Sequence, residues 1–201
     1  MGVHIDERAA FRSAATWFRE VVHQVGDRWD LPGLGEWTVR DLVGHTSRAL
    51  STVESYLDAE PGPVVVESTT AYYLAVGQPS AAVAERGRAA GRALGDDPAA
   101  AIGDLSERVL AKVDSTPDDA FVGTAAGGMR LIDYLPTRTF ELVVHTADLA
   151  SALDLEPAPP SVAAASALSL AGELSLEKGS AVEVLLALTG RRPLAADFTL
   201  V

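Results

Sequence analysis

Hydrophobic residues recur at intervals of three and four along most of this chain, the pattern of helices that bury one face. A first stretch with this pattern covers 6–26 and opens with an aspartate, a residue type that caps helices. A second covers 39–57, and Thr38 and Asp41 at its start resemble a capping box with Asp in place of Glu. The segment between them, 27–37, contains proline and glycine, which predicts a loop.

The helical pattern continues in the middle of the chain between proline and glycine breaks. It predicts a short helical piece over 71–76 and longer helices over 80–94 and from Asp97 onward. Ser80 and Asp97 are the expected caps of the two longer helices. Alternatively, these two segments form one long helix that is interrupted at 95–97.

Glycine and proline then divide the second half of the chain. The glycines within 123–128 favour a turn or a short hairpin, and the apolar spacing over 131–153 predicts another long helix. Pro136 is tolerable in that helix only near its first turn, because proline lacks the backbone N–H that the helix interior uses. The prolines within 157–160 form the clearest linker.

Two further helices are expected after this linker. Ser161 is the predicted cap of a helix that runs to about Lys178, and Ser180 is the predicted cap of a short one. Gly190 is well placed to end the short helix. The tail 198–201 could form a short strand or an extended segment that packs on the rest.

Helices dominate this pattern, so the predicted fold is mainly α. The simplest architecture is an up-and-down helical bundle over 1–156. A small C-terminal helical region over 161–201 would pack on that bundle as an appendage.

Composition narrows the function classes. A length of 201 residues with 48% hydrophobic content can bury a sizeable core, whereas a formal charge of −12 disfavours nucleic acids and anionic membranes as partners. We find no uninterrupted apolar stretch of the roughly 18–20 residues that a membrane helix needs, and the N-terminal segment lacks the pattern of a signal peptide. We therefore expect a cytoplasmic protein. The chain has no cysteine, which excludes thiolate ligands and a cysteine nucleophile.

Three residues could together hold a metal. Glu141 and His145 lie four apart in a predicted helix and so project from the same face. His45 lies three after Leu42 and four before Ala49, so its side chain should point toward the core. Two histidines and one carboxylate are a ligand set of catalytic zinc sites, which leave one coordination position open for water or substrate. The same set suits iron or nickel, so the residues do not fix the metal.

A simpler interpretation is that His45 and His145 are unrelated core histidines and that Glu141 is a surface acid. The apolar residues around 141–150 weigh against it, because a buried carboxylate needs a counter-charge, either Arg138 one turn back or a metal. Asp148, three residues after His145, could accept a hydrogen bond from the imidazole and orient it, or it could face solvent.

Three segments of the chain resemble a known family. Segment 35–45, Gly-Glu-Trp-Thr-Val-Arg-Asp-Leu-Val-Gly-His, resembles the first signature of the mycothiol-dependent maleylpyruvate isomerase family, within the wider DinB-like metal-binding bundles. Segment 141–149, Glu-Leu-Val-Val-His-Thr-Ala-Asp-Leu, resembles the second signature, and 188–194, Leu-Thr-Gly-Arg-Arg-Pro-Leu, looks like the C-terminal one. The three segments occur in the order of the family.

The resemblance implies a DinB-like four-helix bundle and assigns the metal-ligand roles to His45, Glu141 and His145. It also implies an active-site arginine from the C-terminal region, for which Arg191 is the nearest candidate and Arg192 the alternative. The implied cosubstrate is mycothiol, a low-molecular-weight thiol bound at the open metal position, and the implied partners are this thiol and a small organic substrate.

Three functions remain open at this point. One is an isomerase or S-transferase that uses the thiol, and another is a non-catalytic metal-binding or regulatory bundle. The third is a metal-dependent hydrolase, which would need a separate general base. We expect a monomer or a homodimer.

Overall fold

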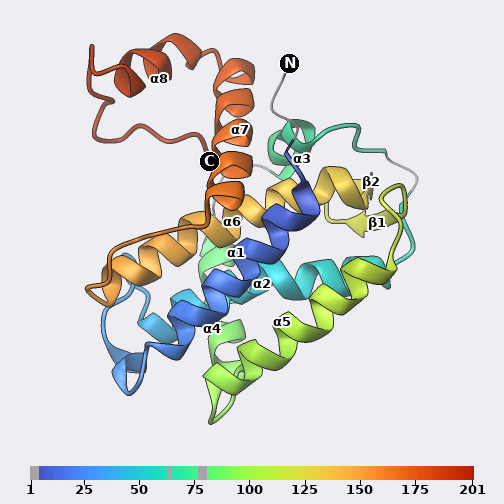
Figure 1. The fold of residues 1–201 in the computed structure, drawn as a ribbon, viewed down its shortest axis with the longest axis vertical. Helices are drawn as coiled ribbons and strands as arrows, with labels where there is room; N and C mark the ends of the chain where they lie inside the picture. The colour runs from blue at the N-terminus through green and yellow to red at the C-terminus, as the bar shows by residue number, and fades with distance from the viewer. Residues whose placement is uncertain (1–4, 63–64, 77–80) are drawn as a thin grey trace.

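The computed structural model describes residues 5–62, 65–76 and 81–201, and most of them lie in helices (Figure 1). The helices are α1 (Glu7–His23), α2 (Val39–Leu57), α3 (Thr69–Val76), α4 (Ala81–Ala93), α5 (Pro98–Ser115), α6 (Leu131–Ala152), α7 (Ser161–Glu177) and α8 (Ala181–Leu188). A 3-10 turn, η1 (Arg28–Asp30), interrupts the loop after α1. Strands β1 (Phe121–Thr124) and β2 (Gly127–Arg130) pair antiparallel, so the glycine-rich segment forms the hairpin that was one of its two predicted structures.

Four of the helices, α1, α2, α5 and α6, form the central bundle. Helix α1 packs against α5 and α6, and α2 packs against the same two helices, so α1 and α2 occupy opposite corners. Their inward faces carry the apolar positions that the helical spacing predicts, and the largest of these side chains are fully buried. They include Phe11, Phe18, Leu42, Leu50, Ile102, Leu135, Leu142 and Leu149. The mainly helical bundle expected from the sequence is confirmed.

Polar side chains cap the helices where the sequence predicts them in three cases. The carboxylates of Asp6 and Asp97 each accept a hydrogen bond of 3.0 Å from the backbone N–H three residues later. Thr38 and Asp41 form the capping box, with reciprocal hydrogen bonds of 3.1 and 3.2 Å. These bonds satisfy N–H groups that have no partner inside the helix. The predicted cap Ser80 lies outside the described residues.

Other details of the helix ends differ from the prediction, and of the two forms predicted for the tail only the strand is excluded, since Val201 packs against the core. Ser161 is the first residue of α7 and caps nothing, because Pro160 already occupies the cap position at the end of the proline linker. Ser180 does occupy the cap position of α8, but its side chain makes no capping hydrogen bond. Pro136 lies beyond the first turn of α6, inside the helix. The tail 198–201 forms no strand.

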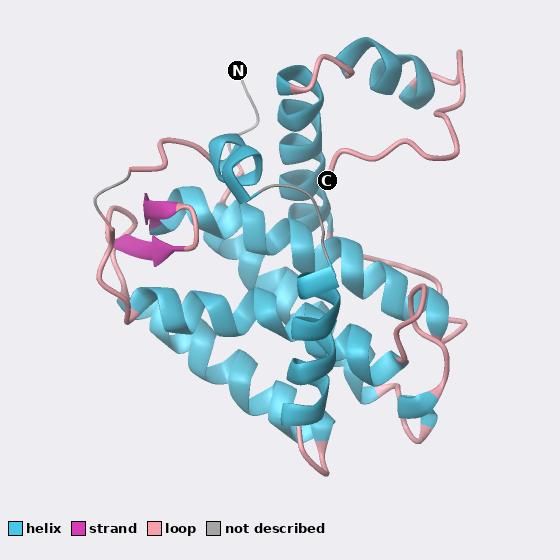
Figure 2. Ribbon diagram, turned by 180° about the vertical axis from the view of Figure 1, so that it is seen from behind, coloured by secondary structure: helices cyan, strands magenta, loops and turns pink. Residues whose placement is uncertain are grey.

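Helices α4 and α5 are separate, and the chain turns between them at 94–97. Helix α4 packs closely on α2, on the outside of the central bundle (Figure 2). The two backbones meet at Gly44 and Gly91: a Cβ atom added to Gly44 would lie 2.1 Å from the backbone nitrogen of Gly91. Only a glycine pair allows this approach, which places α4 against the helix that carries His45.

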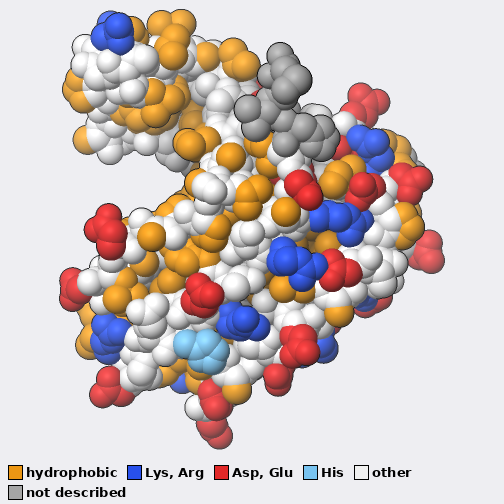
Figure 3. Space-filling model, in the orientation of Figure 1, with side chains coloured by type: hydrophobic (Ala, Val, Ile, Leu, Met, Phe, Trp, Pro, Cys, Tyr) orange, Lys and Arg blue, Asp and Glu red, His pale blue; other side chains and the backbone are white. Residues whose placement is uncertain are grey.

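The C-terminal region is less tightly packed than the bundle. Helix α7 packs against α1, α3 and α6, whereas α8 contacts α7 and buries none of its residues. Val182, Leu185 and Leu188 of α8 are consequently exposed. Apolar side chains gather on the surface of the projecting region (Figure 3). The division into a bundle over 1–156 and a C-terminal region over 161–201 stays a prediction. Within the described ranges, no helix combines the length and the apolarity that crossing a membrane requires.

Candidate metal centre

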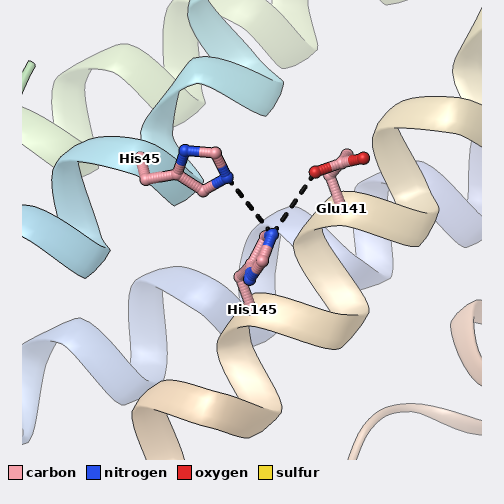
Figure 4. A group of neighbouring side chains, drawn as sticks. All are labelled: His45, Glu141 and His145. Carbon is pink, nitrogen blue, oxygen red and sulfur yellow. Dashed lines mark hydrogen bonds and ion pairs between the residues drawn. The ribbon is translucent and has the colours of Figure 1, made fainter. Parts of the chain in front are cut away.

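Helices α2 and α6 bring the three predicted ligands together. His45 extends from α2 toward α6, and Glu141 and His145 stand one turn apart on the facing side of α6 (Figure 4). One nitrogen or oxygen atom from each side chain lies within 4.8 Å of the corresponding atoms of the other two. Within the part of the chain that the structure describes, no fourth His, Asp or Glu joins this group.

The distances between the donor atoms suit a small divalent ion. Nε2 of His45 lies 3.2 Å from Nε2 of His145, and the latter lies 3.4 Å from Oε2 of Glu141. With metal–ligand bonds of about 2.0–2.1 Å at tetrahedral angles, neighbouring donor atoms are roughly 3.3 Å apart. The residues present therefore fit a metal bound by two imidazoles and one carboxylate, with a further position left for another ligand.

Neighbouring side chains hold two of the ligands in orientation. Nδ1 of His145 lies 3.1 Å from Oδ2 of Asp148, which is the first of the two roles that the sequence leaves open for Asp148. A proton on Nδ1 leaves the Nε2 lone pair for a metal. The hydroxyl of Tyr73, on α3, donates a hydrogen bond of 2.8 Å to Oε1 of Glu141. Since Tyr73 engages Oε1, the other carboxylate oxygen is the one that faces His145.

Electrostatics assign a protonation state to the metal-free site. Burial alone lowers the pKa of His145, but the hydrogen bonds to Asp148 and Glu141 outweigh it and raise the pKa to about 9. Burial, together with the charge on His145, lowers the pKa of His45 to about 4. Burial alone raises the pKa of Glu141, but the contact with His145 and the charge of Arg138 lower it to about 2. At neutral pH, a proton on His145 thus takes the place of a metal cation.

His45 is held by packing on its other side. Its ring lies 4.6 Å from the ring of Trp37, measured between centroids. Gly87 of α4 leaves room for both, because a Cβ atom there would lie 3.1 Å from the Trp37 ring and 3.2 Å from Cβ of His45. Nδ1 of His45 is buried without a hydrogen-bond partner among the described residues. His45 therefore lacks the second partner that orients His145.

A cavity of about 890 Å³ opens beside the three ligands and is lined mainly by α2, α3, α4 and α6. Four cationic side chains line it, namely Arg48, Arg86, Arg138 and Lys178, whereas Glu141 is its one acidic side chain among the described lining residues. The charged side chains of the cavity wall are thus mostly positive, whereas the net charge of the whole protein is negative. The cavity is large enough for a small organic molecule next to the metal position.

Arg138, one of the two counter-charges that the sequence suggests for Glu141, acts on it without direct contact, because its charge helps to lower the pKa of the Glu141 carboxyl. In the described ranges, no ion pair within 4.0 Å joins the two side chains. The Arg138 guanidinium instead lies over the rings of Tyr72 and Tyr134, at 5.4 and 5.0 Å from their centroids. The direct partners of the Glu141 carboxylate are His145 and Tyr73.

The C-terminal region reaches the cavity through residues that differ from the predicted ones. Lys178, Leu200 and Val201 line the cavity, whereas Arg191 is exposed, donates a hydrogen bond of 2.9 Å to the carbonyl oxygen of Thr189 and is absent from the lining. Arg192 is exposed as well and is also absent from the lining. An active-site role for either arginine stays a prediction, and in the arrangement described here neither side chain contributes to the cavity wall.

Among the residues next to the three ligands, Tyr73 and Arg48 were not predicted from the sequence. Tyr73 lies 68 residues before its partner Glu141, and no spacing rule links a short apolar helix to a distant carboxylate. Arg48 could have been found, because it follows His45 by three residues and must share its face of α2.

Together these features define a helical-bundle protein with a half-buried group of two histidines and one carboxylate beside a large cavity. The chain belongs to the family of the mycothiol maleylpyruvate isomerase N-terminal domain, whose model matches residues 8–150. This fold is DinB-like, and the matched range contains all three candidate ligands and ends before α7. No curated protein and no solved structure matches the chain.

Proposed function

We propose that this protein is a cytoplasmic, metal-dependent enzyme that uses mycothiol, a low-molecular-weight thiol, as its cosubstrate. The reaction is the isomerisation of a small unsaturated acid or S-transfer to a small electrophile. The observation that carries the proposal is the convergence of His45, Glu141 and His145 at the wall of the 890 Å³ cavity. Three protein ligands leave a coordination position free, and structural zinc sites are usually closed by four.

The absence of cysteine supports a thiol supplied from outside the chain. A bound divalent metal, zinc in the first place with nickel or iron as alternatives, lowers the pKa of a thiol that coordinates it. Neighbouring residues of the chain orient the metal ligands. Asp148 keeps the proton on Nδ1 of His145, and Tyr73 fixes the carboxylate of Glu141. Trp37 keeps the ring of His45 in place.

Addition of the thiol sulfur to a conjugated double bond, rotation about the resulting single bond and expulsion of the same thiol give cis–trans isomerisation with no net consumption of thiol. When the sulfur stays bonded to the electrophile, the result is S-transfer. Both reactions need the electrophile and the thiol together in one cavity, and the volume beside the ligands provides room for the two.

Metal analysis of the purified protein, followed by thermal unfolding with mycothiol or with glutathione, tests this proposal. We expect a stabilisation that requires the metal and is larger with mycothiol, and turnover of an unsaturated keto acid that requires added thiol. His45→Ala should abolish both metal binding and turnover. His23→Ala, which changes an exposed histidine of α1, is the matched control and should alter neither.

The alternatives make different predictions in the same experiment. Equal turnover with and without thiol would contradict the cosubstrate and favour a metal-dependent hydrolase. Bound metal without turnover for any thiol would favour a non-catalytic metal-binding or regulatory bundle. Loss of metal binding in His23→Ala, with retention in His45→Ala, would contradict the site itself.

A further inference from the structure

Positive charge gathers in the cavity although the protein as a whole is strongly acidic. The chain has 16 lysine and arginine residues against 28 aspartate and glutamate residues, yet the described cavity wall contains four cationic side chains and one acidic one. A concave wall of one sign focuses the electrostatic potential and raises the local concentration of ligands of the opposite sign. The cavity therefore favours an anionic ligand.

Arg138 is the most informative of the four cations because it is deeply buried. Its side chain is 8% exposed, and its Nε donates a hydrogen bond of 2.9 Å to Oγ1 of Thr137. Among the described residues its guanidinium makes no other hydrogen bond and no ion pair within 4.0 Å. It lies over the rings of Tyr72 and Tyr134, and the charge of Glu141 acts on it without direct contact. Stacking on aromatic rings leaves the N–H groups at the end of the guanidinium without protein acceptors, and Arg138 lines the cavity, where a ligand can supply them.

Arg48 has a similar position on the opposite helix. It is half-buried, lines the cavity and has no ion pair with any described residue. Arg48 follows His45 by three residues on α2, and Arg138 precedes Glu141 by three residues on α6. Residues three apart share a helix face, so each arginine lies about one turn from a candidate metal ligand.

We infer that Arg48 and Arg138 form an anion subsite that binds a carboxylate group of a small organic acid beside the candidate metal centre. This inference rests on the proposed function and names the part of the site that selects an acidic substrate. A guanidinium presents N–H groups in a planar fork that matches the two oxygen atoms of a carboxylate. Arg86, exposed at the cavity wall, and Lys178 add positive charge around the subsite.

A purely structural role explains less of this arrangement. Packing against Tyr72 and Tyr134 alone could be supplied by an uncharged side chain of similar length. It also gives no reason for a second unpaired arginine at the same cavity. An anionic ligand in the cavity that both arginines line would supply acceptors to them.

Calorimetric titration of maleate, a small unsaturated dicarboxylate, into the thiol-free protein tests the subsite. We expect maleate to bind both the metal-free and the zinc-loaded protein, and its uncharged dimethyl ester to bind neither. Arg48→Gln and Arg138→Lys should each weaken maleate binding by about tenfold or more, because each removes charge-assisted hydrogen bonds to the ligand. Zinc content should be unchanged in both variants.

Arg92→Gln is the matched control, since Arg92 is an exposed arginine of α4 that pairs with Glu85. It should bind maleate as the parent does. Should Arg138→Lys fail to fold, as judged from its thermal unfolding, the half-buried Arg48→Gln still decides the question.

Several outcomes would overturn the subsite. Unchanged maleate affinity in Arg48→Gln and in any folded Arg138→Lys would do so, as would maleate binding that depends on zinc and not on either arginine. Tighter binding of inorganic phosphate than of maleate would contradict the assignment to an organic acid. Because no thiol is present, these results do not depend on whether mycothiol is the cosubstrate, so the subsite and the proposed function can fail separately.

Discussion

Acidification should weaken zinc binding by about tenfold per pH unit between about pH 5 and about pH 8, because one proton must leave the site when the metal enters. In the metal-free protein that proton belongs to His145, whose pKa is raised to about 9 by Asp148 and Glu141. His45, with a pKa lowered to about 4, and Glu141, with a pKa lowered to about 2, have already lost theirs in this range.

Zinc affinity falls with falling pH because the proton and the metal compete for one lone pair of His145. Above the pKa of His145 the imidazole is neutral and the affinity for zinc should no longer rise with pH. Below that pKa each unit costs about 1.4 kcal/mol of binding free energy. Below about pH 4 His45 also binds a proton, and the dependence should steepen to about a hundredfold per unit. From the sequence alone, the pH below which zinc affinity falls would be expected near the ordinary histidine pKa of about 6.5.

Competition with a zinc chelator, corrected for the chelator's own protonation, measures the affinity at each pH. Calorimetry in buffers of different ionisation enthalpy counts the released protons independently, and about one is expected near pH 7. Asp148→Asn removes one of the hydrogen bonds that hold the proton on His145, so the plateau should begin at a lower pH. An affinity that stays constant over this range would refute a histidine ligand that must lose a proton, and a release of two protons would refute a neutral His45.

Three further predictions concern single residues. Tyr73→Phe should lower zinc affinity by about tenfold to a hundredfold without unfolding the protein, because it removes the donor that fixes the carboxylate ligand, and the chelator assay measures this. Gly44→Ala should lower the free energy of unfolding by about 1–3 kcal/mol or more, measured by urea denaturation, since its Cβ collides with Gly91, whereas Gly103→Ala, which meets open space, should not destabilise the protein. Arg191→Ala should lower turnover and leave zinc content intact if this arginine binds a substrate carboxylate, and unchanged turnover would remove it from the site.

The helices could be predicted because their information is local. The three- and four-residue spacing of apolar side chains places α1, α2, α5 and α6 in their observed segments, and Asp6, Thr38 and Asp97 mark three helix starts. The error at Ser161 shows the limit of this approach. A serine followed by apolar residues looks like a cap, but the proline before it already takes that position, so the helix begins one residue earlier.

The convergence of the site is a tertiary property that the sequence indicates only in part. Glu141 and His145 share a helix face by spacing alone, and the apolar neighbours of His45 turn it inward. That α2 faces α6 depends on the packing of the whole bundle. The role of Tyr73 depends in addition on where the short helix α3 rests, and nothing in a string of apolar residues specifies that.

The number of charged residues can be read from the sequence, but their positions in the fold cannot. A net charge of −12 determines the electrostatic field around the protein and therefore which large partners approach. This field falls off over about 10 Å at moderate salt. Inside the cavity the nearest charges dominate, because the surrounding protein screens them less than water does. Arg48 and Arg138 line the cavity without an ion pair within 4.0 Å to any described carboxylate, while most acidic side chains lie on the exterior. A protein of net negative charge can thus carry, in the wall of one cavity, arginines that favour an anionic ligand.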